Sequence, residues 1–211
     1  MRVVIAGGHG KIALLTARLL TSRGDEVVAL VRNPDHFTDV RDAGAQPVLC
    51  DLESADAASV AEHLKDADAA VFAAGAGPGS GAERKDTVDR AASALFASAA
   101  EQAGVSRFVQ ISTTGIGRVT GDKVFDAYLK AKAAAEEDLK SRPLHWTILR
   151  PGRLTDQPPT GNVELAESPR RGEIPRADVA AVVVALLDHP TTTTHRTYEL
   201  IAGSTPIAES L

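Results

Sequence analysis

The chain has 211 residues, 44% of them hydrophobic, with a formal net charge of −5 and a pI near 5.7. A chain of this length can bury a full core, so we expect a single domain over residues 1–211. The acidic balance argues against nucleic acid or an anionic membrane as the main partner, because both attract basic surfaces.

Signals for targeting and for disulfide or metal chemistry are weak. No apolar run approaches the roughly eighteen residues that a membrane span needs, and Met1-Arg2 leads directly into an apolar strand pattern. The single cysteine, Cys50, cannot form an internal disulfide, which suits a reducing compartment. The six histidines show no metal-ligand spacing among themselves or with Cys50. We therefore expect a cytoplasmic protein with no membrane segment and no metal site.

The first stretch of the chain predicts a strand, a glycine turn and a helix. An apolar run at 3–6 breaks into a glycine-rich run at 7–11, and an apolar helical pattern follows. Glycine lets the backbone approach a phosphate closely, and the free N–H groups at a helix start attract an anion. With a second strand predicted at 26–31, the pattern indicates a dinucleotide site formed by Gly7, His9, Gly10, Lys11 and Ile12.

Lys11 allows two interpretations. A cation in the first helical turn opposes the helix dipole, so this side chain either offsets a bound pyrophosphate or is simply solvated. A P-loop is excluded, because Ile12 follows Gly10-Lys11 where that motif needs Ser or Thr.

The end of the second predicted strand bears on which dinucleotide binds. NAD sites usually place Asp or Glu about twenty residues past the glycines, whereas this chain has Arg32-Asn33 there and no acid before Asp35. A guanidinium suits a 2′-phosphate, so we predict NADP rather than NAD. The alternative is that Arg32 is only a surface charge after a strand.

The third predicted strand, at 45–50, ends at Asp51-Leu52, which we assign to the cofactor site. Asp51 either accepts a hydrogen bond from the adenine amino group or caps the helix that follows. Both roles use the same carboxylate, so the sequence leaves the choice open.

The fourth predicted strand, at 69–75, is apolar throughout and ends in Ala73-Ala74-Gly75. Small side chains there permit close approach of a ribose at the carboxyl edge of the sheet, so these three residues are also assigned to the cofactor site. The segment 75–82, rich in Gly, Pro and Ser, is either a mobile lid or an ordinary connection.

The rest of the chain continues the alternation of helix and strand. The patterns predict a helix at 82–103, a strand at 107–111, a helix at 122–141, a strand at 145–149, a helix introduced by Arg176-Ala177-Asp178, and a strand at 198–201. This alternation predicts an α/β fold, a Rossmann-type doubly wound parallel sheet. Residues 1–151 form the expected cofactor-binding core, and 152–211 add a very small substrate-side portion with the last helix and strand.

Several motifs along the chain resemble the short-chain dehydrogenase/reductase superfamily, in its atypical NAD(P)-binding branch with NmrA-like and epimerase-like proteins. They are Gly7-x-x-Gly10-x-x-Ala13, Asp51-Leu52, Ala73-Ala74-Gly75, Ser112-Thr113, Tyr128-x-x-x-Lys132 and Arg150-Pro151-Gly152. Their order and spacing are more specific than any one of them. The resemblance also implies that Pro151 borders the cofactor.

The resemblance implies catalytic roles for four residues. Tyr128 would exchange a proton with a substrate oxygen, and Lys132 would stabilise the phenolate and hold the nicotinamide ribose. Thr113, with Ser112 as the neighbouring candidate, would polarise the substrate carbonyl. Asp89 stands where extended members of the family have asparagine, and a carboxylate there would raise the pKa of the tyrosine or repel an anionic substrate.

Two classes of function fit these motifs. The first is an NADPH-dependent oxidoreductase, or an epimerase-like enzyme with the same hydride chemistry, acting on a small carbonyl or quinone-type substrate. The second is a sensor of NADP redox state without turnover, of the NmrA type; the Tyr128–Lys132 pair favours the enzyme. Arg153 and Arg176 are the cationic candidates near the cleft, and a homodimer through helices 82–103 and 122–141 would follow the family pattern.

Overall fold

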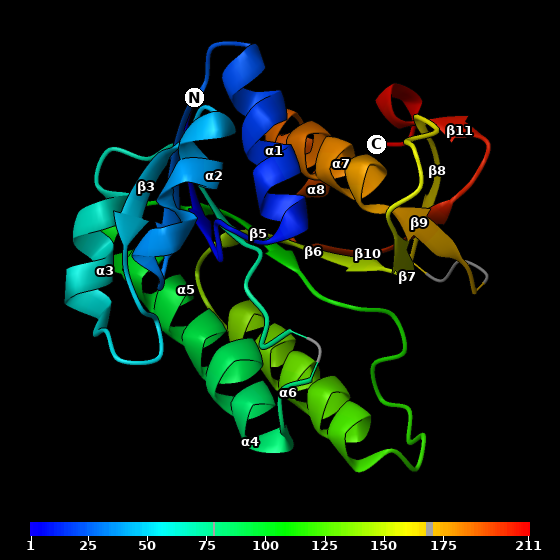
Figure 1. Cartoon of the computed structure of the whole chain (residues 1–211). Coiled ribbons are helices and arrows are strands. Elements are labelled where there is room, and N and C mark those ends of the chain that lie inside the picture. Colours follow the sequence, from blue (N-terminus) through cyan, green and yellow to red (C-terminus); the bar gives the residue numbers. More distant parts are fainter. Residues whose placement is uncertain (78, 168–170) are drawn as a thin grey trace.

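The computed structural model describes residues 1–77, 79–167 and 171–211. Among these residues, nine strands form one sheet in the order β11-β8-β10-β6-β5-β4-β1-β2-β3, with helices on both faces (Figure 1). The predicted Rossmann-type α/β fold is therefore confirmed.

The bounds of the elements follow the predicted order. The strands are β1 (Arg2–Ala6), β2 (Glu26–Val31), β3 (Gln46–Leu49), β4 (Ala69–Phe72), β5 (Arg107–Ile111), β6 (His145–Pro151), β7 (Arg153–Thr155), β8 (Asn162–Ala166), β9 (Glu173–Pro175), β10 (Arg196–Ala202) and β11 (Thr205–Pro206). The helices are α1 (Lys11–Ser22), α2 (Phe37–Asp42), α3 (Ala57–Leu64), α4 (Ala82–Arg84), α5 (Ala92–Ala103), α6 (Lys123–Lys140), α7 (Arg176–Asp188) and α8 (Pro190–Thr193). Short η segments are η1 (Pro34–His36), η2 (Lys85–Ala91) and η3 (Ile207–Glu209).

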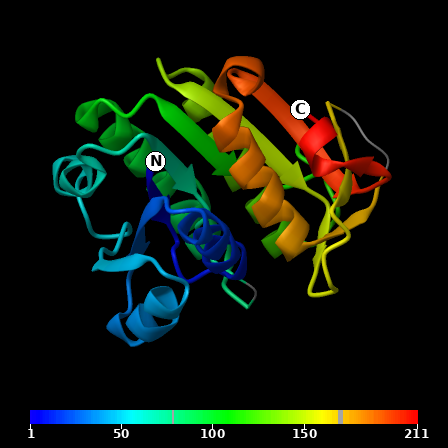
Figure 2. The same cartoon turned by 90° about the horizontal axis from the view of Figure 1, so that it is seen from above.

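Strand β1 shows how the sequence pattern builds the core on both faces of the sheet. Successive side chains of a strand point to opposite faces. Val3 and Ile5 accordingly pack in the cluster that includes α1, α2 and α7, whereas Val4 and Ala6 pack with α3, α5 and α6. Figures 1 and 2 show α1 and α7 on one face of the sheet and α5 and α6 on the other. A strand buried on both faces explains the continuous apolar run.

The chain reverses its direction across the sheet between β1 and β4. From β1 it proceeds through β2 to β3 at one edge, and from β4 through β5 and β6 toward the other. These strands are parallel, so the loops that follow β1 and β4 leave the same edge side by side. Open α/β sheets bind their ligands at such a switch point.

The C-terminal part differs from the prediction of a wholly parallel sheet. Strands β8 and β11 are antiparallel to their neighbours, and β7 pairs with β9 in a separate parallel pair of strands. The segment 152–175, predicted without strands, supplies three of these elements, although 168–170 lie outside the described residues. A strand is stabilised by packing against its neighbouring strands, and the neighbours of these short strands are distant in the chain. Their own sequences therefore give only a weak strand signal.

The helix predicted at 82–103 is confirmed in its bounds, but it consists of the short α4, the π-helix η2 and the α-helix α5. One predicted element boundary is wrong. The fourth strand ends at Phe72 rather than Gly75, which leaves 73–75 as a loop. Among the described residues, no helix combines the length and apolar character that a membrane crossing would need.

Candidate functional site

The glycine turn after β1 forms a close-fitting cradle. Gly7 has φ +75°, and a Cβ there would lie 2.5 Å from the Cα of Ala74, so only glycine fits. Gly10 donates its N–H to the Gly7 carbonyl at 2.9 Å and is the N-cap of α1. Since glycine has no side chain that could cap the helix, the first N–H groups of α1 are left for an anion, as a dinucleotide pyrophosphate requires.

Two cavities flank this cradle and meet at Ala73, Ala74 and Gly75. The first, here the Arg32 cavity, has a volume of about 280 Å³ and lies toward β2 and β3. The second, here the Tyr128 cavity, has a volume of about 530 Å³ and lies toward β5 and α6. Together they form one elongated groove along the carboxyl edge of the sheet, centred on the switch point.

The structure sorts the predicted site residues between these cavities. Lining the Arg32 cavity are Gly7, His9, Gly10, Arg32, Asp51 and Leu52. Lining the Tyr128 cavity are Ile12, Ser112, Tyr128, Lys132 and Pro151. Residues from five strand ends are thus brought to one edge.

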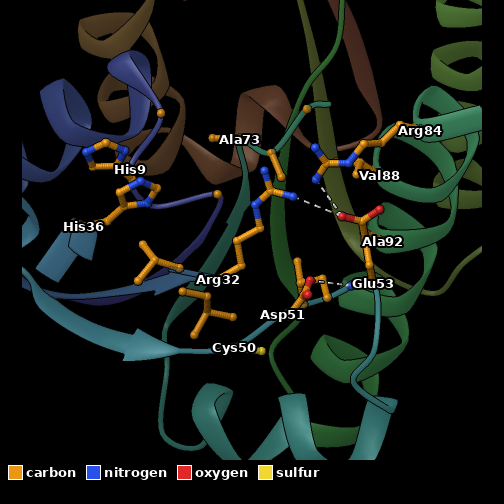
Figure 3. Close-up of a pocket in the computed structure, with 17 residues that line it drawn as sticks. His9, Arg32, His36, Cys50, Asp51, Glu53, Ala73, Arg84, Val88 and Ala92 are labelled. Carbon is orange, nitrogen blue, oxygen red and sulfur yellow. Dashed lines mark hydrogen bonds and ion pairs between the residues drawn. The ribbon is translucent and has the colours of Figure 1, made fainter. Parts of the chain in front are cut away.

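A carboxylate that the sequence did not indicate organises the Arg32 cavity. Glu53 accepts from Arg32 at 3.3 Å and from Arg84 at 2.7 Å, and it also accepts from the Thr87 hydroxyl. Figure 3 shows the two guanidinium groups converging on this carboxylate. Arg32 thus lines the cavity and takes part in this cluster of ion pairs, with a side chain that is 52% exposed.

Asp51 lines the Arg32 cavity and does not cap a helix. Its side chain accepts the N–H of Glu53 at 3.1 Å, and the cap of α3 is Asp56, which accepts from Ser59 N–H. The helix-cap alternative for Asp51 is therefore wrong. The residue lines the cavity from the end of β3.

His9 of the glycine turn contacts one carboxylate and stacks on one aromatic ring. Its Nε2 lies 2.7 Å from Asp39 Oδ2, and its ring stacks on His36 with centroids 3.6 Å apart. These contacts tie the turn to the segment after β2 and form one wall of the Arg32 cavity (Figure 3). Within the described residues, no group of three or more His, Cys, Asp or Glu could hold a metal ion.

The Tyr128 cavity contains buried charge. Lys132, 4% exposed, donates to the Ile111 carbonyl at 3.2 Å, and its Nζ lies 3.2 Å from Asp89 Oδ1. The second Asp89 oxygen accepts the N–H of Ala76, which ties the loop after β4 to η2. The Lys132 Nζ also lies 5.9 Å from the centroid of the Tyr128 ring.

Burial raises the pKa of Tyr128 from its usual 10.0 to about 12. A hydrogen bond with the Thr113 side chain lowers this pKa, and the Asp89 charge raises it further. The expectation that a carboxylate at 89 raises the tyrosine pKa is thus confirmed. At neutral pH Tyr128 therefore carries its proton.

The two predicted hydroxyls are not equivalent. Ser112 donates to the buried Glu136 at 2.6 Å, and Glu136 is held in turn by Arg150. The Thr113 hydroxyl donates to the Thr114 carbonyl at 3.3 Å, and a hydrogen bond with its side chain lowers the pKa of Tyr128. Ser112 lines the Tyr128 cavity, whereas Thr113 is not among its lining residues.

Lys11 lies outside both cavities at the surface. Its Nζ is 2.6 Å from Asp156, a carboxylate that also binds Arg176 at 2.7 Å. This ion pair links α1 to the segment after β7, and the sequence did not predict it. Arg153 is exposed and pairs with Glu173.

Helix α7 begins at Arg176, as the sequence predicts, and Asp178 lies in its first turn without capping it. The N-cap of α7 is Pro175, and the buried Asp178 carboxylate accepts the N–H groups of Thr160 and Gly161 at 2.9 Å each. It therefore fixes the turn before β8. A carboxylate near a helix start satisfies either role, so local sequence could not separate them.

The family model described as NAD(P)H-binding matches residues 7–190. The chain is 35% identical to the uncharacterized sugar epimerase YhfK of Bacillus subtilis over 100% of this chain and 99% of that protein. A structure from Bacillus halodurans, provisionally described as an NAD-dependent epimerase/dehydratase, is 35% identical and covers 99% of this chain and 97% of its own, with a TM-score of 0.91.

ChuY of Escherichia coli O157:H7, described as an anaerobilin reductase, is 26% identical, with coverage of 96% and 97% and a TM-score of 0.78. These matches span the glycine cradle and both cavities, so they include every element that forms the groove. The chain belongs to the NAD(P)H-binding family, among its epimerase/dehydratase-like proteins of the atypical short-chain dehydrogenase/reductase type.

Proposed function

We propose that this protein is an NADP(H)-dependent reductase of small carbonyl or quinone-type compounds. The observation that carries the proposal is the position of Tyr128 and Lys132 in a cavity that joins the glycine cradle through Ala73–Gly75. A dinucleotide with its pyrophosphate on the cradle would reach both cavities. The reductase name of ChuY supports reduction, and the epimerase name of YhfK is compatible with the same hydride chemistry.

Bound NADPH would supply a hydride to the substrate carbon. Tyr128 would then donate its proton to the substrate oxygen, and its pKa of about 12 keeps that proton available at neutral pH. Lys132 would stabilise the phenolate that remains, and the Thr113 hydroxyl would orient the tyrosine. Each side chain thus has a role in proton transfer that its contacts support.

The preference for NADP is proposed from the Arg32 cavity. Arg32 and Arg84 share one carboxylate, Glu53, so a 2′-phosphate would find two guanidinium groups already converging. In calorimetry, Arg32→Ala should weaken NADP binding by roughly 10- to 100-fold and leave NAD binding unchanged. The matched control is Arg18→Ala, which removes an exposed arginine of α1. Equal affinities of the parent protein for NADP and NAD would contradict the assignment.

A redox sensor is the second candidate, and one observation favours it. The Asp89 carboxylate pairs with Lys132 and raises the pKa of Tyr128, and both effects disfavour a phenolate. A panel of aldehydes, ketones and quinones with NADPH separates the two functions through the loss of reduced-nicotinamide absorbance. Turnover of any member supports the reductase. Tight NADPH binding without turnover of any compound would contradict the reductase function and support the redox sensor.

A further inference from the structure

A second buried lysine lines the Tyr128 cavity. Lys85 is 9% exposed, and its Nζ lies 5.3 Å from the centroid of the Tyr128 ring. That ammonium donates to the Gly77 carbonyl at 2.8 Å. The reaction described above assigns no role to this charge.

Among the described residues, no carboxylate around the cavity forms an ion pair with Lys85. Four charged residues line it, and two of these, Asp89 and Lys132, pair with each other at 3.2 Å. Asp122 is exposed and accepts the N–H groups of Val124 and Phe125 at the start of α6. Within the described part of the chain, Lys85 therefore has a neutral carbonyl as its hydrogen-bond acceptor and no carboxylate. A largely buried ammonium without a carboxylate partner is stabilised by any anion that enters the cavity beside it.

The backbone around Lys85 is also unusual. Lys85 and Asp89 both lie on the π-helix η2, and π-helical turns are rare and frequently occur at functional sites. Gly77, Gly79 and Ser80 also line the cavity, and the two glycines add no side chain to fill it. Because Lys132 offsets the Asp89 charge, that carboxylate does not repel an anion here.

We propose that Lys85 binds a carboxylate group of the substrate, so that the substrates are carbonyl compounds that carry a carboxylate away from the reacting carbon. The inference rests on the proposed reductase function and defines its substrate class. Lys85 fixes one end of the molecule, and the carbonyl at the other end then lies beside Tyr128.

The test separates recognition of the carboxylate from turnover by measuring binding of unreactive probes. Benzoate and its neutral counterpart benzamide are titrated into the protein saturated with NADP⁺, and the ratio of their dissociation constants is compared between variants. We expect benzoate to bind the parent protein at least about tenfold more tightly than benzamide. Lys85→Met should abolish that preference, while Lys85→Arg and the exposed-site control Lys130→Met should keep it.

Lys85 also holds the loop at Gly77, so a purely structural role must give a different result. Loss of that anchor would weaken benzoate and benzamide equally and would leave their ratio unchanged, which would overturn the proposal. Equal binding of the two probes by the parent protein would also overturn it. NADP⁺ affinity and the melting temperature of each variant show that the fold is intact.

Reduction kinetics complete the test with 4-carboxybenzaldehyde and its methyl ester. For the acid, Lys85→Met should raise KM by at least about tenfold with little change in kcat, and for the ester neither constant should change. A benzoate preference without reduction of any aldehyde would support the Lys85 site and contradict only the reductase function.

Discussion

The two cavities differ in how their charges are held. In the Arg32 cavity, Arg32 and Glu53 have side chains 52% and 27% exposed, so water screens their ion pair. In the Tyr128 cavity, Asp89 and Lys132 are 1% and 4% exposed, and each charge depends on the other. In the proposed function the first arrangement would exchange its carboxylate for a phosphate, whereas the second is held by burial. Cofactor binding and proton transfer would then use two differently built cavities.

The largest effect is expected from Tyr128→Phe. Only one oxygen is removed, so folding and NADP affinity should remain close to those of the parent protein. Turnover of a confirmed substrate should fall by roughly 10²- to 10⁴-fold, because the proton donor is lost. Steady-state kinetics and calorimetry measure the two quantities. A variant that turns over at the parent rate would make Tyr128 a packing residue.

Lys132→Met should show that Lys132 and Asp89 depend on each other for the stability of the fold. The change leaves the Asp89 carboxylate buried without its partner, so the free energy of unfolding should fall by roughly 3 to 5 kcal/mol in urea denaturation. Adding Asp89→Asn should recover much of this loss but not the lost turnover. Additive effects of the two substitutions on stability would contradict the coupling.

The free energy of unfolding at alkaline pH should test whether folding raises the pKa of Tyr128. Its pKa is raised on folding from 10.0 to about 12, so its stabilising contribution is complete below pH 10 and is lost as the pH rises toward 12. The loss amounts to roughly 3 kcal/mol, at about 1.4 kcal/mol for each pKa unit. Tyr128→Phe should therefore flatten the pH dependence of unfolding, and the control Tyr198→Phe should not. Parallel curves for all three proteins would rule out a raised pKa.

The smallest effect is expected from Glu53→Gln in the Arg32 cavity. The lost ion pairs are partly exposed, so the free energy of unfolding should change by less than about 1 kcal/mol. NADP should bind more tightly, because the carboxylate no longer competes with the 2′-phosphate for Arg32 and Arg84. Calorimetry with NADP and NAD distinguishes this from a general change of affinity. Weaker NADP binding would mean that Glu53 positions the arginines rather than competing for them.

The sequence by itself determined the features that depend on residues close together in the chain. The glycine turn at 7–10 follows from backbone freedom at Gly7, and the four-residue spacing of Tyr128 and Lys132 puts both on one face of α6. The run at 69–75, which is apolar throughout, likewise indicated a strand buried on both faces, and β4 is buried at every position. These signals are local, because helix and strand periods repeat within a few residues.

Only the tertiary structure decided which charges meet. Glu53 joins Arg32 to Arg84, and Asp89 joins Lys132, across segments far apart in the chain. The π-helix that turns Lys85 into the Tyr128 cavity, and the antiparallel β8, have no periodic signature of their own. Such contacts arise from the packing of whole elements against the sheet, so no short stretch of sequence specifies them.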